Sequence, residues 1–402
     1  MKLRFDERTE AFRGELRSWL EANRPDADVV AADPSRSSAH LPEWARRWQR
    51  RLFENGWLVP GWPPELGGRN ATPIEQMVYF EELARLGVPR SYNPQGLSII
   101  TPSIVDFGTE EQKEAYALPT LRAEITWCLG MSEPGAGSDL ASLSTRAELR
   151  GDDFVVNGQK VWTSGAHHAD LCFCFVRTDP SAPKHGGISV LVIDMKSPGI
   201  RTRPLPELTD PEHADFNEVF FEDVVVPRRN LVGKLNDGWR VTLGSLAHER
   251  GMLWLNHVTG AERVLERLVA LADVRGPRGA RLGDDPRFRE AIGALQVDVL
   301  AMRAMGYRGF ANFARGKVAP EHSILKLFGS ELQQEAWLTA LEWLGARGLD
   351  VSPQLVVAPG SYWERSSWAD QYLRSFSGTI AGGTSEIQRN ILATRILGLP
   401  RD

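Results

Sequence analysis

The sequence predicts a mainly α-helical protein with a β domain in the middle of the chain. Two observations support this fold class: the period of the apolar residues, which changes from helical to alternating and back, and the positions of the turn residues. Residues 1–120 have helical spacing, residues 121–235 alternate, and residues 236–402 return to helical spacing. We therefore expect helices, then a compact β domain, then a helical bundle.

Apolar residues in the N-terminal segment recur every three or four positions. Phe12, Leu16 and Leu20 follow this spacing, and residues 44–52 repeat it with tryptophans and a leucine. This period is typical of helices that bury one face. The stretch 60–68, PGWPPELGG, contains too much proline and glycine to continue a helix, so we expect a structured loop there.

The middle segment contains several short runs rich in β-branched and aromatic residues. Phe154-Val155-Val156 leads into Asn157-Gly158, which is typical of a type I′ turn, so a hairpin with a second strand from Gln159 is expected. The other runs of strand length are 171–176, 188–193 and 219–226, the last ending before Pro227.

Helical spacing resumes after Asn236-Asp237-Gly238. Three apolar stripes are expected to face the core of a bundle. They comprise Val264, Leu265, Leu268, Val269 and Leu271; Ile324, Leu325, Phe328, Leu332, Trp337 and Leu341; and Ile387, Ile391, Leu392 and Ile396.

Composition narrows the function classes. The 402 residues are 42% hydrophobic and 25% charged, which is ordinary for a globular protein, and they contain no apolar run long enough for a membrane span. The net charge of −5 offers no basic stripe for nucleic acid. There are three cysteines, and Cys172 and Cys174 point the same way on a strand, so we expect no disulfide framework and a cytoplasmic location.

Several common catalytic motifs are missing. His248-Glu249 is followed by Met252 where a zinc protease has its second histidine. The adjacent His167 and His168 have no companion ligands nearby, so polar surface is the better interpretation and no metal is expected. There is no phosphate-binding P-loop and no GxSxG elbow, and Leu140 replaces the third glycine of a dinucleotide fingerprint.

Three segments carry the positive signal, each with a plain structural alternative. The first, residues 127–139, reads WCLGMSEPGAGSD and suits an irregular loop whose N–H and hydroxyl groups bind ligand oxygens, or an entry turn of the β domain. The second, 157–165, places a Trp and a Ser two positions apart on one face of a strand. The Trp could form one wall of a ligand site, or it could simply be buried in the core. The third, 375–400, breaks at Gly382-Gly383 before a helix that Thr384 or Ser385 could cap. The start of this helix could bind an anionic ligand, or the segment could be only a well-capped helix.

In this order the segments resemble the acyl-CoA dehydrogenase family over nearly the whole chain. The PGWPPELGG loop, the FFEDVVVPRRNLVG strand and the NDGW turn belong to the same resemblance. It implies an N-terminal helical domain, a middle β-barrel-like domain and a C-terminal four-helix bundle. It also implies FAD between the last two domains and an adjoining subunit, with acyl-CoA as substrate and an electron-transferring flavoprotein as acceptor.

The resemblance implies site residues one by one. Ser132 would lie near the flavin pyrimidine, Ser138 near the phosphate or pantetheine, Trp162 along the isoalloxazine and Ser164 near its N5. The remaining implied flavin contacts are Leu129, Met131 and Gly137 in the first segment, Trp343 and Gly345 in a WLGA segment that reaches an adjoining subunit's FAD, and Thr384 and Glu386 at the adenylate end.

The carboxylate that usually removes the α proton precedes a Gly-Thr pair in this family, and here that position is Gly382. A branch that includes isovaleryl-CoA and long-chain enzymes places the base on an earlier helix before an arginine, which matches Glu249-Arg250. The resemblance thus implies Glu249 as the base and Arg250 directed toward CoA, although Glu249 could instead only pair with an arginine. Gly382 would donate its N–H to the thioester carbonyl, and Gly383 would contact the substrate.

One family motif is altered. The Arg-x-x-Phe-Gly contact to FAD across a subunit interface is replaced by ADVRGPRGARLGDDPRFRE, where Arg275, Arg278 and Arg281 are all candidates. This leaves a homotetramer, a mixed tetramer and a dimer open. Glycine at 382 makes room near the α carbon, which suits long, branched or polycyclic acyl groups.

Two other functions compete with the dehydrogenase. One is a flavin oxidase or monooxygenase of the same fold that acts on a substrate without CoA. The other is a non-catalytic partner subunit of a mixed tetramer. The combination of Trp162, Ser164 and Glu249 argues against the non-catalytic subunit.

Overall fold

The computed structural model describes residues 5–87, 89–209, 214–313, 315, 321–357, 359–361 and 365–400, without the side chains of 245–254, 256, 313 and 322. The chain forms two compact units. The first comprises Met1–Glu249 with Pro359–Tyr362, and the second comprises Arg250–Ala358 with Trp363–Asp402. No helix among the described residues is long and apolar enough to cross a bilayer.

The first unit begins with helices that carry the predicted apolar stripes. Leu16, Leu20, Trp48 and Leu52 are buried in one cluster, as their spacing predicted. Residues 60–68 form a loop with one short 3₁₀ turn, which confirms that prediction too. The helices are α1 (Glu7–Asn23), α2 (Ala27–Ala32), α3 (Glu43–Glu54), α4 (Pro73–Leu86), α5 (Thr101–Phe107), α6 (Glu110–Gln112) and α7 (Leu118–Leu121).

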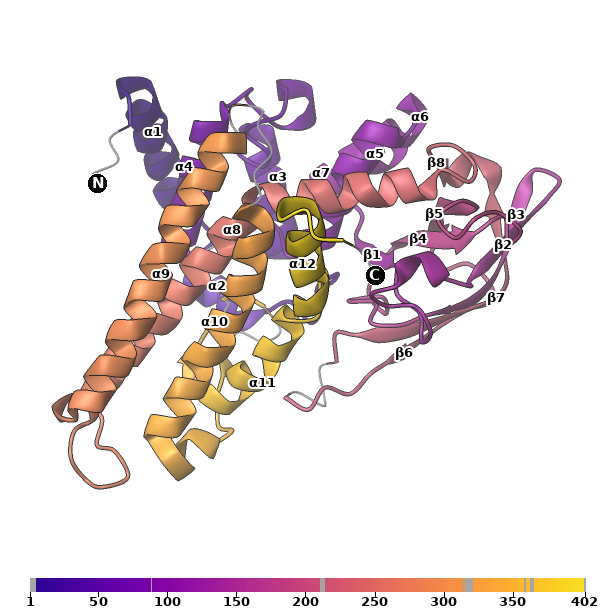
Figure 1. The fold of residues 1–402 in the computed structure, drawn as a ribbon. Helices are drawn as coiled ribbons and strands as arrows, with labels where there is room; N and C mark the ends of the chain where they lie inside the picture. Colours follow the sequence, from indigo (N-terminus) through magenta and orange to yellow (C-terminus); the bar gives the residue numbers. More distant parts are fainter. Residues whose placement is uncertain are drawn as a thin grey trace. The chain divides into compact units, whose positions relative to one another are not determined.

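An eight-stranded sheet follows the helices in the same unit (Figure 1). Its order is β6-β7-β3-β2-β4-β5-β8, and β1 pairs with β4 in parallel. The predicted strands at 171–176, 188–193 and 219–226 are confirmed. The strands are β1 (Trp127–Gly130), β2 (Arg146–Arg150), β3 (Asp153–Lys160), β4 (Leu171–Arg177), β5 (Ile188–Asp194), β6 (Ile200–Pro204), β7 (Asn217–Pro227) and β8 (Leu231–Val232).

The hairpin predicted at Asn157-Gly158 is wrong. Both residues lie inside β3, where the pairing with β7 shifts register between Val156 and Gly158. The Asn157 amide donates to the Asp223 carboxylate of β7 and its side-chain oxygen accepts from the Asp223 N–H, both at 2.9 Å. The Asn-Gly pair therefore forms a bulge within the pairing of β3 with β7, because cross-strand pairing outweighs the local preference for a turn.

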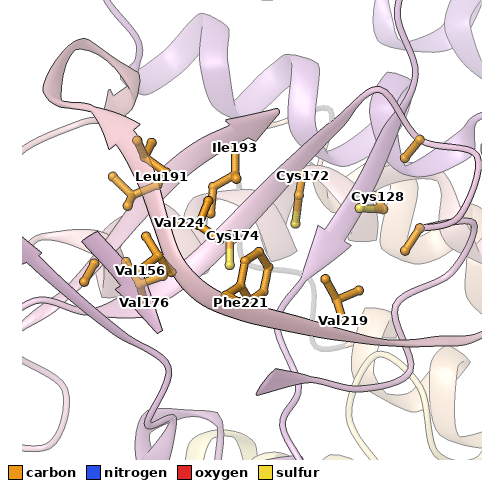
Figure 2. Packing of buried hydrophobic residues seen from close by; sticks show 14 of the residues in the cluster. Cys128, Val156, Cys172, Cys174, Val176, Leu191, Ile193, Val219, Phe221 and Val224 are labelled. Atoms are coloured by element: carbon orange, nitrogen blue, oxygen red, sulfur yellow. The ribbon is translucent and has the colours of Figure 1, made fainter. Parts of the chain in front are cut away.

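Strand β4 is buried on both faces, as an interior strand of a covered sheet should be. Cys172 and Cys174 point into one cluster, which Figure 2 shows with Phe221 nearby. Phe173 and Phe175 alternate with them into a second cluster. The prediction that the two cysteines share a face is confirmed, and all three cysteines are free thiols in the core.

The second unit is a helical bundle (Figure 1). Its central helix α10 packs against α9, α11 and α12. Most predicted stripe residues are buried or half-buried, but Val269 and Ile396 are 52% and 41% exposed, so these two do not face the core of this chain. The elements are α8 (Gly238–Ala270, within this unit from Arg250), α9 (Pro286–Phe313), α10 (Glu321–Leu344), α11 (Trp368–Gly378), α12 (Ser385–Ile391) and a two-stranded ribbon of β9 (Leu355–Val356) and β10 (Arg365–Ser366).

Candidate active site

The first candidate segment leaves the sheet at the end of β1 and folds into a tight turn. Glu133 and Ala136 exchange two backbone hydrogen bonds, of 2.9 and 3.0 Å, around Pro134-Gly135. The Ser132 carbonyl accepts from the Val161 N–H at 2.9 Å, which ties the loop to the end of β3. This segment is therefore an ordered loop, and its backbone is fixed from behind by the sheet.

A buried ion pair lies under this loop. Lys160, at the end of β3, donates to the Glu133 carboxylate at 2.8 Å and to the Met131 carbonyl at 3.0 Å. The two charged side chains are only 1% and 4% exposed. Ser144 and Thr145 donate their backbone N–H groups to the same carboxylate, at 2.6 and 2.9 Å.

The environment of Glu133 sets its protonation. Burial by itself would raise the pKa of this carboxyl group. The charge of Lys160 and the hydrogen bonds from Lys160, Thr145 and Ser144 outweigh burial and lower the pKa of Glu133 to about 2. The carboxylate is thus ionised at neutral pH and acts as a fixed anchor for the loop rather than as a proton acceptor.

The outer part of the loop is open. Gly137 and Ser138 are exposed, whereas Leu129, Met131 and Ser132 are half-buried. A methyl group added at Gly135 or Gly137 would meet no atom of the chain within 4 Å. Packing within the chain therefore does not require glycine at either position, and the space in front of the loop is available to a ligand that approaches the backbone closely.

Trp162 is the most unusual side chain near this loop. The prediction that it shares a strand face with Ser164 is wrong, since β3 ends at Lys160 and Trp162 has a left-handed backbone with φ of 58°. Its indole is 62% exposed and, among the described residues, makes an edge-on ring contact to Phe216, at 6.0 Å between ring centroids. The core-tryptophan alternative is also wrong. The backbone thus presents a large apolar ring to solvent, where a ligand can reach it.

Ser164 lies between two backbone contacts with the start of β7. Thr163 exchanges hydrogen bonds of 3.0 and 3.1 Å with Asn217, and the Gly165 N–H donates to the Asp215 carbonyl at 2.8 Å. The Asp215 side chain is buried and accepts from the N–H and hydroxyl of Ser38, at 2.8 and 3.0 Å. Burial raises the pKa of Asp215, while hydrogen bonds from Ser38 and Ser164 oppose that rise.

The two adjacent histidines belong to a small cluster behind this segment. The ring of His168 lies 4.2 Å from that of His167 and 5.2 Å from that of His40, and it bonds to the Ser37 hydroxyl at 3.0 Å. Burial, followed by the charges of these neighbours, lowers the pKa of His168 to about 4. Among the described residues, no group of histidines, cysteines and carboxylates could hold a metal ion.

The third candidate segment lies in the second unit and contains a glycine turn between α11 and α12. Gly382 and Gly383 have φ values of 66° and 93°, which favour glycine. Thr384 caps α12 by accepting the Ile387 N–H at 3.2 Å, so of the two predicted caps the threonine is the one used. The Glu386 side chain is 77% exposed, as a ligand contact needs to be.

A separate pocket of about 400 Å³ lies in the same unit, between residues 276–287 and the end of α10. Trp343 lines it and contacts Phe288 edge-on at 5.3 Å. Gly345 is adjacent, with φ of 58°, and a methyl group there would lie 2.9 Å from Pro277. The other lining residues are Gly276, Pro277, Arg278, Ala280, Arg281, Leu282, Asp285, Arg287 and Glu342.

The three arginines that could replace the altered motif are each bound within the chain. Arg278 pairs with Asp285 at 2.9 Å, Arg281 pairs with Asp273 at 2.6 Å, and Arg275 donates to the Gly279 carbonyl at 2.7 Å. These pairs are exposed, so each stabilises the loop only weakly. The structure therefore singles out no arginine as the replacement for the altered motif.

Glu249 and Arg250 fall within helix α8, where their side chains lie outside the described residues. Sequence reasoning missed Lys160, Glu133 and Asp215, which hold the loop and Ser164 in place. A signal was present for the lysine, because Lys160 occupies a buried position in the alternation of β3. The pairing with Glu133 spans 27 positions and is not visible in the sequence.

These features suit a flavin dinucleotide. The exposed, strained Trp162 provides an aromatic surface, and the open space at Gly135 and Gly137 allows close backbone approach. The second unit offers the glycine turn and a pocket with an aromatic wall and arginines, of the kind that an adenylate requires.

Comparison with known proteins assigns the family. Residues 6–124, 128–224 and 236–397 match the acyl-CoA dehydrogenase N-terminal, middle and C-terminal domains. The acyl-CoA dehydrogenase IpdE1 of Mycobacterium tuberculosis (strain ATCC 25618 / H37Rv) is 37% identical over 98% of both chains.

Solved structures agree with this assignment. The Tcur3481-Tcur3483 steroid ACAD is 31% identical with a TM-score of 0.81 over 100% of both chains. The ChsE4-ChsE5 complex from Mycobacterium tuberculosis is 30% identical, also with a TM-score of 0.81 over 100% of both chains. The chain therefore belongs to the acyl-CoA dehydrogenase family and is an FAD-dependent oxidoreductase that acts on acyl-CoA.

Proposed function

We propose that the protein oxidises an acyl-CoA thioester to the trans-2-enoyl-CoA and passes the electrons to an electron-transferring flavoprotein. The exposed Trp162, held in a left-handed backbone beside the ordered loop of residues 131–139, is the observation that carries this proposal. Most of this ring is not covered by the described part of the chain, and it suits the face of an isoalloxazine.

The chain's own residues divide the work of binding. Ser132 and Ser138 would donate hydrogen bonds to the flavin and to the phosphate or pantetheine, and Ser164 would lie near the flavin N5. Trp343 and Gly345 would contact the FAD of an adjoining subunit. Leu129, Met131 and Gly137 would line the flavin, while Thr384 and Glu386 would hold its adenylate end.

Glu249 is the proposed base. Its carboxylate removes the α proton of the thioester as the Cα–H bond breaks, and a double bond forms as the Cβ–H bond breaks with loss of hydride. Bound FAD supplies the hydride acceptor. Gly382 donates its N–H to the thioester carbonyl, Gly383 lies against the substrate, and Arg250 points toward CoA. A desolvated Glu249 beside an acyl chain would have a raised pKa, which suits proton abstraction near neutral pH.

We propose a polycyclic, steroid-type acyl group as the substrate class. One similar protein with solved structures, the Tcur3481-Tcur3483 steroid ACAD, is a steroid acyl-CoA dehydrogenase; it is 31% identical, and its single-site variant is 30% identical. Glycine at position 382 leaves space near the α carbon, which is compatible with a bulky acyl group. Long or branched chains would use the same space.

We further propose a mixed assembly, either a tetramer or a dimer, in the cytoplasm. The candidate arginines Arg275, Arg278 and Arg281 are bound within the chain. Because the usual motif is altered, a different chain would have to supply the flavin contact across the subunit interface. ChsE4-ChsE5 is a complex of two different chains, which supports a mixed rather than a homomeric assembly. Three free, buried thiols suit a reducing compartment.

The test begins with the visible spectrum of the protein purified alone. Bound flavin that bleaches anaerobically with a steroid-CoA thioester supports the proposal, whereas reduced flavin that reacts rapidly with oxygen indicates an oxidase. Glu249→Gln should abolish bleaching while FAD stays bound, and Glu266→Gln, an exposed change on the same helix, should not. Retained turnover in Glu249→Gln would refute the base assignment.

A further inference from the structure

Helix α10 carries a buried lysine that no part of the proposed mechanism uses. Lys326 is only 9% exposed, and its ammonium donates to the carbonyl of Gly383 at 2.6 Å. Lysines are rarely buried without a partner, because removing the ammonium from water is costly. The carbonyl that accepts from Lys326 belongs to the glycine turn before α12.

A second buried side chain holds the preceding peptide. Gln388 is 3% exposed and donates from its amide to the carbonyl of Gly382 at 3.2 Å. Its amide nitrogen also lies 2.8 Å from where a methyl group on Gly383 would be placed. The turn thus has no side chains of its own to pack, and its two carbonyls are held by residues of α10 and α12.

Holding a carbonyl also directs an N–H group. The C=O and N–H of one trans peptide point in opposite directions, and the peptides described here are trans. Gln388 on the Gly382 carbonyl therefore turns the N–H of Gly383 away from the side chain that holds it. Lys326 fixes the next peptide in the same manner and so directs the N–H of Thr384. Within the described part of the chain, the N–H groups of Gly383 and Thr384 have no acceptor.

The histidine next to Lys326 is neutral near pH 7. Burial, and then the charge of Lys326, lowers the pKa of His257 to about 4, so this imidazole is neutral near pH 7. The nearby Glu386 is exposed, with hydrogen bonds in its own turn as the main cause of its lowered pKa. The bond of 2.6 Å from the Lys326 ammonium to the Gly383 carbonyl is charge-assisted, and such bonds are stronger than those between neutral groups.

We propose that Lys326 and Gln388 are positioning residues, which hold the Gly382-Gly383 turn so that the N–H groups of Gly383 and Thr384 face a ligand oxygen. This inference rests on the proposed function for the identity of that oxygen. It belongs either to the FAD diphosphate or to the thioester carbonyl, and both are oxygens that bear or develop negative charge. A turn used only to end one helix and begin the next would not need a buried cation.

The first measurement requires no ligand. Amide hydrogen exchange of residues 379–390 is compared between the wild type and Lys326→Met, which keeps the length of the side chain and removes its charge and donors. We expect exchange in this segment to become at least about tenfold faster, as the loss of one hydrogen bond to a charged group predicts. Thr339→Val, a buried change on the same helix whose hydroxyl bonds only to its own helix turn, is the control and should leave the segment unchanged.

The second measurement identifies the oxygen. Weaker FAD binding to the Lys326→Met apoprotein, followed by flavin fluorescence, indicates the diphosphate. Unchanged FAD binding with a lower kcat and an unchanged KM indicates the thioester carbonyl. Unchanged exchange, or faster exchange with both flavin measurements at wild-type values, overturns the proposal.

Two further outcomes are separable. If Lys326→Met does not fold, Gln388→Met carries the same test through the Gly382 carbonyl, with the same expected and contrary results. If the wild type binds no FAD at all, the proposed function fails, and the exchange measurement still decides whether Lys326 orders the turn.

Discussion

Removing the charge of Lys160 should destabilise the first unit more than most single changes. In Lys160→Met, the Glu133 carboxylate stays buried with its N–H donors but without its cation. Breaking a buried pair by removing one partner costs about 3–5 kcal/mol. The lowered pKa of Glu133 gives a similar figure, since a shift from 4.5 to about 2 corresponds to about 3 kcal/mol in favour of the ionised form.

The effect should depend on pH with a definite sign. Because the folded-state pKa of Glu133 lies below its unfolded value, the ion pair contributes fully above pH 4.5, and its contribution is lost as the pH falls toward 2. In Lys160→Met, burial raises the pKa of Glu133, so the carboxyl group takes up a proton more easily. The difference between wild type and variant should therefore shrink as the pH is lowered from 7 to 4.

Urea unfolding at pH 7 and pH 4.5 measures both effects. The double variant Lys160→Met/Glu133→Gln separates charge from packing, because it removes the buried charge altogether and should recover most of the lost stability. FAD affinity should fall in the single variant, since Met131 loses the donor on its carbonyl. A free energy of unfolding within about 1 kcal/mol of wild type at pH 7, or a double variant as unstable as the single one, would refute this reasoning.

Two shorter predictions concern the same unit. Trp162→Ala should change the free energy of unfolding by less than about 1 kcal/mol, because the ring is exposed. It should weaken FAD binding about tenfold, whereas Trp57→Ala, at a buried position, should mainly destabilise the fold in urea. For His168, whose folded pKa is about 4, stability should fall as the pH drops from 6.5 to 4, by up to about 3 kcal/mol. His168→Gln should remove this contribution and leave that of His257, whose pKa is also lowered to about 4; an unchanged pH dependence of stability would contradict the assignment.

The elements that the sequence predicted well are those whose pattern is long and periodic. The stripe of Leu16 and Leu20 and the strand 171–176 appear as expected, because burial of one face or both faces dictates their period. The prediction of a turn at Asn157-Gly158 was wrong, because the pairing of two long strands overrides the weak local preference of two residues. Ile396 was assigned to a buried face but is 41% exposed, which a periodic pattern alone could not reveal.

The candidate site was predictable in its loops and not in the contacts that hold them. Ser132, Ser138 and Trp162, which the resemblance places near the flavin, lie on ordered loops, and Trp162 is exposed as a ligand contact requires. The left-handed backbone of Trp162 was not foreseen, because φ at one residue depends on where the strand before it ends. Their anchors come from distant positions: Glu133 for Lys160, and Gly383 for Lys326.

The two anchors point to a common physical solution. Each candidate ligand segment is rich in glycine, so it has few side chains with which packing could fix its orientation. In each case a buried lysine donates to a backbone carbonyl of the segment, Met131 in one unit and Gly383 in the other. An ammonium in a medium of low polarity forms a strong, directional bond to a carbonyl, and the planar peptide transmits that direction to the N–H on its other side. A loop without side chains can thus present its backbone donors in one orientation, at the cost of desolvating one lysine.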